Sequence, residues 1–464
     1  MRFLAFYHTY ACGGKKGPCY NGVMKFRVEK MLRNGLGRAG EIETAHGVIK
    51  TPAFMAVGTQ GYVRFLSAAD LRAVGAQAML SNGFHLRRKA EEIAAAGGLA
   101  AWRAERSDGL GESGGDADSA ERREGLGESG GDAAEQKGRG EAWGGPTLTD
   151  SGGFQVMSLG SGLGKVVSME KERRVTNTAH QERLAHVTEE GVDFVDPFDG
   201  RPERIGPEES MRIQCAIGAD IHMAFDELTS LADSYEYNVE ALGRTERWAE
   251  RSLREHLRLR DQLGYRQNLY GVLQGGRWED LRRATARRLG AMEVNGVGFD
   301  GFGLGGAFLK EDLGEILRWC DEELPVEKPR HLLGLSHPDD ILLGAEMGAD
   351  TFDCVAPTRE ARHGKIYTRD GNLNLRKFAG AGEPLEEGCD CPTCRAGWTR
   401  GSLRALWRSG DAEKKAQYNR LASMHNLRFI VRLTEDIRAA MLGDYFEEYK
   451  REFLARYWGD GAGA

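Results

Sequence analysis

The sequence has no continuous apolar run of the roughly 18–20 residues that a membrane-spanning helix requires. Its N-terminal stretch also lacks the long apolar region and the small-residue cleavage site of a secretory signal peptide. No G-x-G-x-x-G pattern follows an early predicted strand, so nothing in the sequence supports a dinucleotide site. The absence of a membrane span and of a signal peptide predicts a cytoplasmic protein that has no membrane partner.

The chain has 464 residues, which is enough for one large barrel or two medium domains. Charged residues make up 29% and hydrophobic residues 41%, a balance typical of globular proteins. The net charge is −7, but this does not exclude a nucleic-acid partner, because such binding depends on a local basic patch.

Two segments differ in composition from the rest. Residues 1–23 show no periodicity and are expected to form a disordered N-terminal extension, with Met24 as a candidate start. In residues 102–141 the stretch SDGLGESGGDA, from Ser107, recurs almost unchanged as REGLGESGGDA, from Arg123. A segment so rich in Gly, Ser, Asp and Glu buries too little apolar surface to fold. We therefore expect 102–141 to be a disordered insertion in a domain covering 24–464.

Short apolar runs that end abruptly in polar residues or glycine alternate with helix-like stretches. The runs are AQAMLSNGF, PTLTDSGGF, VDFVDPFDG, DIHMAFDE, LYGVLQGG, FDGFGLGG, RHLLGLSH and DTFDCVAPT. An amphipathic helix is predicted from Pro207, between the third and fourth runs. About eight strand–helix units predict an α/β fold, a (β/α)8 TIM barrel. A doubly wound open sheet is the competing topology.

In such a barrel, functional residues gather at the C-terminal ends of the strands. The runs put Asp150, Asp226, Gln274, Gly306 and Asp353 there. Asp150 and Asp353 could act as nucleophile and acid/base in glycosyl transfer, or could simply cap turns.

A second group of strand-end residues suits the recognition of a purine. Asp226 and Gln274 could hydrogen-bond to its edge, and Phe154, beside Gly152 and Gly153, could stack on its face. The alternatives are ordinary loop chemistry for the polar residues and a core position for the ring.

Three cysteines lie within six residues, at Cys389, Cys391 and Cys394, and His425 follows 31 residues later. Three thiolates and one imidazole complete a closed tetrahedral zinc shell of the structural kind. His363 is the weaker candidate for the fourth ligand. We predict a zinc-binding subdomain over 385–430, inserted near the C-terminus.

Basic residues follow Asp353 directly, at Arg359, Arg362, His363 and Lys365. A basic flank behind a candidate catalytic carboxylate suits phosphate binding. The alternative is a solvated run of charge.

These motifs together resemble tRNA-guanine transglycosylase of the bacterial kind, in the queuine tRNA-ribosyltransferase family. The matching stretches occur in family order and cover almost everything from Met24 to Tyr457 apart from the insertion. They are TPAFMAVGTQGYVRFLS, LSNGFHL, GPTLTDSGGFQVMSL, PEESMRIQCAIGADIHMAFDE, YGVLQGG, GFGLGGA, KPRHLLGL, DTFDCVAPTREARHGK, CDCPTC and MHNLRF. The resemblance implies a TIM barrel with a zinc-bearing subdomain.

The resemblance also implies an activity, the exchange of guanine at the tRNA wobble position for a 7-deazaguanine. Asp353 would attack ribose C1′ to give a covalent glycosyl-enzyme, and Asp150 would be the general acid and base. The implied base contacts are Ser151, Gly152, Gly153, Phe154, Asp226, Gln274, Gly306 and Leu333. The implied anticodon-loop contacts are Gly334, Asp340, Thr358, Arg359 and Arg362. One structural Zn²⁺ per chain would be bound by Cys389, Cys391, Cys394 and His425.

Several alternatives stay open. Leu228 and the stretch Ala307–Lys310 differ from the bacterial pattern around the 7-substituent, so the incoming base could be 7-aminomethyl-7-deazaguanine, its 7-cyano precursor or queuine. A related enzyme acting on DNA and a non-catalytic tRNA-binding partner subunit are the competing functions, and a barrel glycosidase would also use two carboxylates. The resemblance implies a homodimer.

Overall fold

The computed structural model describes residues 25–33, 35–102, 141–161, 185–263, 266–377 and 382–459. The predicted extension over 1–23 lies outside these ranges. So does the predicted disordered insertion, apart from its two end residues, Trp102 and Glu141.

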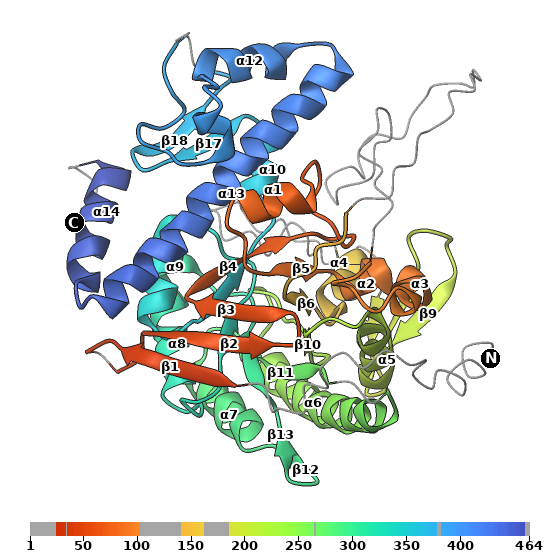
Figure 1. Ribbon diagram of the computed structural model, residues 1–464. Coiled ribbons are helices and arrows are strands. Elements are labelled where there is room, and N and C mark those ends of the chain that lie inside the picture. The colour runs from red at the N-terminus through yellow and green to blue at the C-terminus, as the bar shows by residue number, and fades with distance from the viewer. Residues whose placement is uncertain are drawn as a thin grey trace, which may run out of the picture.

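Eight parallel strands close into a barrel, so the predicted fold class is confirmed (Figure 1). In chain order the strands are β4 (Ala53–Val57), β5 (Met79–Ser81), β6 (Thr147–Thr149), β10 (Ile221–Met223), β11 (Asn268–Leu273), β14 (Gly301–Leu304), β15 (Arg330–Leu332) and β16 (Thr351–Asp353). Each strand pairs with its successor, and β16 pairs with β4 to close the ring. This order brings the C-terminal ends of all eight strands to one mouth.

One predicted barrel strand is wrong. The run VDFV forms β8 (Val192–Val195), which pairs antiparallel with β7 (Ala185–Val187) and β9 (Pro202–Ile205) outside the barrel. The missing barrel strand is β4, whose first four residues are all buried. The physical difference is that buried and accessible residues alternate along β8, as in a sheet with one solvated face, whereas a barrel strand is covered on both faces.

Helices cover the outside of the barrel. They are α1 (Ala68–Ala73), α2 (Gly83–Leu86), α3 (Ala90–Ala95), α5 (Pro207–Ile217), α6 (Tyr235–Leu263), α7 (Glu279–Gly290), α8 (Leu313–Asp321) and α9 (Pro338–Glu346). Helix α4 (Gly153–Ser161) packs instead against β7 and β8. The helix predicted from Pro207 is confirmed as α5, with proline in its first turn and Gly218 in the left-handed conformation at its end.

An antiparallel sheet packs against one end of the barrel. Its strands are β1 (Phe26–Met31), β2 (Arg38–Thr44) and β3 (Gly47–Thr51). Ile42 and Ile49 from this sheet join one core cluster with inward-facing barrel residues such as Met55, Leu148 and Tyr270. The sheet therefore closes the interior at the end opposite the mouth.

A second, smaller layer follows β16. It contains α10 (Ala356–Arg362), β17 (Lys365–Thr368), β18 (Gly371–Asn374), α11 (Pro392–Arg395) and α12 (Arg400–Arg408). The long helix α13 (Ala412–Leu442) packs against α10, α11 and α12 and continues onto β4, and α14 (Phe446–Trp458) follows it (Figure 1). The predicted subdomain limit at residue 430 falls inside α13, so one helix joins this layer to the barrel.

Candidate functional site

Asp150 follows the last residue of β6, at the mouth of the barrel. Its Oδ2 accepts a hydrogen bond from Asn82 Nδ2 at 2.6 Å, and its Oδ1 accepts one from the Gly83 N–H at 2.9 Å. Both donors come from the turn after β5, the neighbouring strand. Gln155 Nε2 adds a longer contact to Oδ2 at 3.4 Å. The carboxylate is therefore held in one orientation by groups that favour its ionised form.

The pKa of Asp150 is nevertheless strongly perturbed. Burial, and to a smaller extent the charge of Asp353, raise the pKa of Asp150 to about 7, against the opposing effect of the Gly83 and Asn82 hydrogen bonds. A carboxyl group that is about half protonated at neutral pH can both give and take a proton. The Coulomb interaction also means that the two predicted catalytic carboxylates lie near each other.

Asp353 is the last residue of β16 and is 9% exposed. Its Oδ1 accepts hydrogen bonds from His331 Nε2 and from the Gly334 N–H, both at 3.1 Å. Within the described ranges no hydrogen bond reaches its Oδ2. One carboxylate oxygen is anchored and the other is open to a reacting partner.

A polar group lies across the mouth from Asp353. Asp226 follows β10, and its two oxygens accept hydrogen bonds from Gln274 Nε2 at 2.6 Å and Ser151 Oγ at 3.2 Å. Burial raises the pKa of Asp226 to about 6, although these two donors oppose the shift. Gln274 Oε1 is buried and accepts no hydrogen bond from the described residues. The group therefore has an unused acceptor and a carboxyl group that titrates near neutral pH, which suits a hydrogen-bonding base edge.

Gly306 approaches this group as bare backbone. Its φ is +113°, and a Cβ there would lie 2.5 Å from a guanidinium nitrogen of Arg282 and 3.1 Å from Gln274 Oε1. Arg282 is fully buried and donates to the carbonyls of Gly276 and Gly305, both at 2.8 Å, so it ties together the loops after β11 and β14. Only glycine fits both the conformation and the space.

Two predicted stacking residues occupy different surroundings. Phe154, in the first turn of α4, is 40% exposed, so it is not a core aromatic. Leu333, just after β15, points towards the barrel axis, because its side chain lies beside Gly303 and near Met223. Gly152, two residues before Phe154, has a φ of +79° and lies against Phe84. An exposed ring is available to stack on a ligand.

The four predicted metal ligands come together. His425 Nδ1 lies 3.8, 3.5 and 3.4 Å from the sulfurs of Cys389, Cys391 and Cys394. Zinc bonds of roughly 2.3 Å to sulfur and 2.05 Å to nitrogen, at tetrahedral angles, put these atoms about 3.6 Å apart. His425 Nε2 donates to the Tyr367 carbonyl at 2.8 Å, which leaves Nδ1 unprotonated for a metal. The cluster can hold a metal ion and is compatible with structural zinc.

His363, the weaker candidate ligand, lies outside this cluster. It is exposed, and its Nδ1 donates to the Arg359 carbonyl at 2.8 Å. Cys391 caps α11 and His425 lies in α13, so a bound metal would join these two helices.

The residues predicted to contact RNA differ in how much of each is exposed to solvent. Arg359 is exposed and Arg362 half-buried, and both lie in α10, directly after Asp353. Thr358 and Asp340 are buried. Thr358 Oγ1 donates to the Val355 carbonyl, and Asp340 accepts from Lys310 Nζ at 2.9 Å. Gly334 is exposed, but its N–H is engaged with Asp353. Arg359 and, in part, Arg362 are therefore accessible to a phosphate, whereas Thr358 bonds to the backbone of Val355 and Asp340 to the side chain of Lys310.

Two polar residues of the site were not predicted from the sequence. His331 and Asn82 both contact a predicted catalytic carboxylate. A signal was available for Asn82, which follows the apolar run MLS, whereas His331 lies inside the run RHLL. Their partners are 22 and 68 residues away, so spacing along the chain could not identify the contacts.

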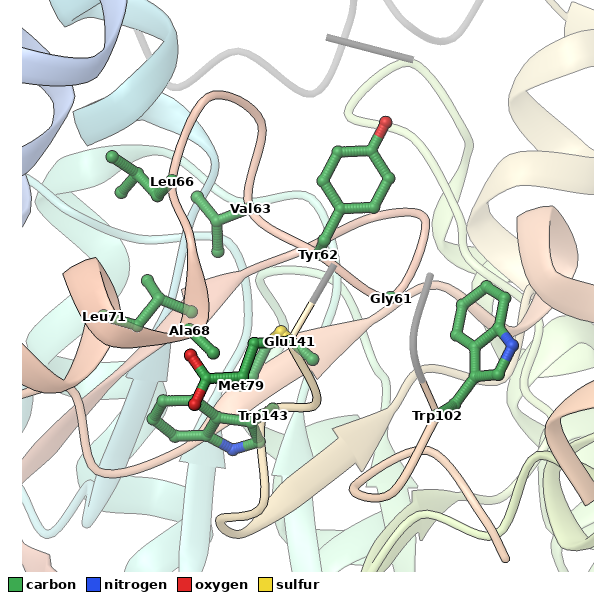
Figure 2. Close-up of a pocket in the computed structure, with 10 residues that line it drawn as sticks. All are labelled: Gly61, Tyr62, Val63, Leu66, Ala68, Leu71, Met79, Trp102, Glu141 and Trp143. Atoms are coloured by element: carbon green, nitrogen blue, oxygen red, sulfur yellow. The ribbon is translucent and has the colours of Figure 1, made fainter. Parts of the chain in front are cut away.

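Figure 2 shows a small pocket in the structure. It is lined by Gly61, Tyr62, Val63, Leu66, Ala68, Leu71, Met79, Trp102, Glu141 and Trp143, none of which is a predicted site residue. Its volume of about 20 Å³ has room for roughly one water molecule. The pocket is therefore not a candidate for holding a purine.

Within the described part of the chain, no helix is both long and apolar enough to cross a membrane.

A family model described as queuine tRNA-ribosyltransferase matches residues 33–122 and 132–458. Three curated relatives are named queuine tRNA-ribosyltransferase. The protein of Clostridium tetani is 36% identical over 92% of this chain and 97% of its own length. Those of Lactococcus lactis subsp. lactis and Fusobacterium nucleatum are each 36% identical over 94% of this chain and 96% and 98% of their own lengths.

Proposed function

The chain belongs to the queuine tRNA-ribosyltransferase family, and on that premise we propose that it exchanges guanine at the tRNA wobble position for a 7-deazaguanine through a covalent enzyme intermediate. The observation that carries the proposal is the pair of carboxylates at one barrel mouth. Asp353 is anchored through one oxygen only, and Asp150 has a pKa of about 7.

In the first half of the reaction, a lone pair on Asp353 forms a bond to ribose C1′ as the bond from C1′ to guanine N9 breaks. The bonding pair leaves with guanine, and the Asp150 carboxyl proton neutralises the departing base. In the second half, the incoming base gives a proton to the Asp150 carboxylate. Its N9 then bonds to C1′ and releases Asp353. One glycosidic bond replaces another, so the exchange needs neither water nor a nucleotide cofactor.

Asp226 and Gln274 read the purine edge. Asp226 has a pKa of about 6, so its carboxyl group can accept from or donate to a ring nitrogen, and Gln274 offers its unused Oε1. Gly306 provides backbone that can approach the ring closely, and Ser151 holds the Asp226 carboxyl in place. Gly152 and Gly153 leave the base room against the backbone, with Phe154 and Leu333 covering its two faces.

Zn²⁺ is the metal we propose for the cluster of Cys389, Cys391, Cys394 and His425. Three thiolates and one imidazole leave no position for a substrate, so the ion would stabilise α11 and α13 and supply no chemistry. Helix α10 belongs to the same layer as this cluster and begins three residues after Asp353, and its Arg359 and Arg362 would bind phosphates of the anticodon loop.

Three further proposals concern the surroundings of the reaction. The partner is a tRNA with guanine at the wobble position, the enzyme works as a homodimer, and it acts in the cytoplasm. Sedimentation with and without tRNA measures the oligomeric state. Leu228, in the loop after β10, packs beside Met157. The candidate incoming bases are 7-aminomethyl-7-deazaguanine, its 7-cyano precursor and queuine.

The test is incorporation of labelled guanine into unmodified tRNA, with Asp353→Asn as the inactive control. We expect the wild type to incorporate guanine and the reaction stopped midway to carry ribose on Asp353 after digestion. Incorporation into DNA but not tRNA would favour the DNA-acting alternative. A folded, zinc-loaded wild type that binds tRNA without exchange would favour the partner-subunit alternative. An adduct on another residue would refute the assignment of Asp353.

A further inference from the structure

The nucleophilic carboxylate is held asymmetrically. Oδ1 of Asp353 receives two donors, His331 Nε2 and the Gly334 N–H, both at 3.1 Å. No donor among the residues in the described ranges reaches Oδ2. The two oxygens of one carboxylate are chemically equal until such contacts distinguish them.

His331 owes its orientation to a second contact. Its Nδ1 lies 2.9 Å from Thr351 Oγ1, and both residues are completely buried. His331 pairs with Thr351 in the register of β15 and β16. Thr351 and Asp353 are two residues apart on β16, so their side chains point to the same face and one imidazole ring can bridge them.

The Asp353 carboxylate selects the tautomer of the ring, because its oxygens only accept hydrogen bonds, and the Thr351 hydroxyl matches that tautomer as a donor to Nδ1. When Oγ1–H donates to Nδ1, the single proton of a neutral imidazole lies on Nε2, where it faces Asp353 Oδ1. The opposite tautomer would direct a nitrogen lone pair at the carboxylate and would repel it. The hydroxyl, the ring and the carboxylate thus form one directed chain of hydrogen bonds.

We propose that His331 is a positioning residue for the covalent step, and that Asp353 Oδ2 is the oxygen that bonds to ribose C1′; this rests on the function proposed above. Oδ2 gives the electron pair for the new bond as the C1′–N9 pair leaves with guanine. His331 keeps its proton throughout, because Oδ1 remains its acceptor in the ester that forms. The ring acts by fixing the plane of the carboxylate.

Without His331, Oδ1 retains only the Gly334 N–H, and the carboxylate can turn about its Cβ–Cγ bond. Loss of a group that orients a reacting one typically costs roughly 10–100-fold in rate. The loss should appear in kcat for guanine exchange. KM for tRNA should change little, because His331 is buried beneath the reacting group and touches no solvent.

The experiment compares His331→Leu with Thr351→Val and Thr351→Ser. Thr351→Val keeps the shape and removes the hydroxyl, whereas Thr351→Ser restores it. We expect both His331→Leu and Thr351→Val to lower kcat 10–100-fold and to slow formation of the ribosyl adduct in a single turnover. Thr351→Ser should recover most of the rate, which a purely structural role for Thr351 would not predict.

His222→Leu is the matched control. His222 is also a completely buried barrel-strand histidine, with its Nε2 3.0 Å from His256 Nδ1, but it lies on β10, four strands around the barrel from β16. It should leave kcat per folded enzyme unchanged. Circular dichroism and zinc content establish folding for each variant.

The proposal is overturned if folded Thr351→Val and His331→Leu both keep the wild-type kcat, or if their defect lies in KM. In that case exchange by the wild type and its absence in Asp353→Asn still support the proposed function. Absence of exchange by the wild type would overturn both.

Discussion

Asn82→Ser should move the alkaline limit of guanine exchange to higher pH. Asn82 donates its Nδ2–H to Asp150 Oδ2 at 2.6 Å, a contact that favours the ionised carboxylate. Serine is too short to replace this donor, but it can still cap α2, where Asn82 Oδ1 now accepts from the His85 N–H. The substitution therefore removes one contact and keeps the turn.

The size of the shift follows from the strength of the lost contact. A hydrogen bond to a charged group contributes roughly 1.5–3 kcal/mol, which corresponds to about 1–2 pKa units. The pKa of Asp150, about 7 in the wild type, should rise to roughly 8 or above. At pH 8 the protonated fraction would then increase about fivefold, from roughly one tenth to one half.

The assay is the initial rate of labelled guanine incorporation between about pH 5.5 and 9.5, with the alkaline limb fitted to one ionisation. Gln155→Leu is the matched comparison, because its Nε2 contact with the same oxygen is longer, at 3.4 Å, and should give a smaller shift. A limb that stays in place in folded Asn82→Ser, or moves to lower pH, would refute this account of Asp150.

Three further predictions follow from burial and charge. Cys391→Ser should lose bound zinc and roughly 4 kcal/mol or more of stability, measured by metal analysis and unfolding, whereas Cys320→Ser, at an equally buried site outside the cluster, should keep the metal. Asp150→Asn should be more stable than the wild type above pH 7, by up to roughly 4 kcal/mol, because the raised pKa of Asp150 makes the folded wild type lose stability as pH rises from about 4 to 7. Urea unfolding should therefore show the difference at pH 8 and not at pH 4. Deletion of residues 103–140 should retain most exchange activity, because a Gly/Asp/Glu-rich segment has no core to lose, and an insoluble product would contradict this. This deletion is narrower than 102–141, because Trp102 is buried against Leu99 and Ile93 and Glu141 pairs with Arg72.

The sequence by itself determined the fold class, the residues of the metal cluster and the position of Asp150 and Asp353 at one end of the barrel. Three cysteines in six residues form a local pattern that survives any arrangement of the rest of the chain, and Asp150 and Asp353 end apolar runs whose ends must meet at one mouth of a parallel barrel. The tertiary structure decided which runs build the barrel, with β4 in place of β8, because this depends on whether the second face of a strand is covered.

Only the tertiary structure decided how each carboxylate is held. His331 reaches Asp353 through the pairing of β15 with β16, and Asn82 reaches Asp150 across β5 and β6. The buried pair of Arg38 and Asp350 joins residues 312 positions apart, with its Nε–Oδ1 contact at 3.0 Å. Periodicity and spacing report the surroundings of a residue along its own strand or helix. The partner of a buried polar group is set by strand register and barrel closure, which bring distant residues within hydrogen-bonding distance only once the chain has folded.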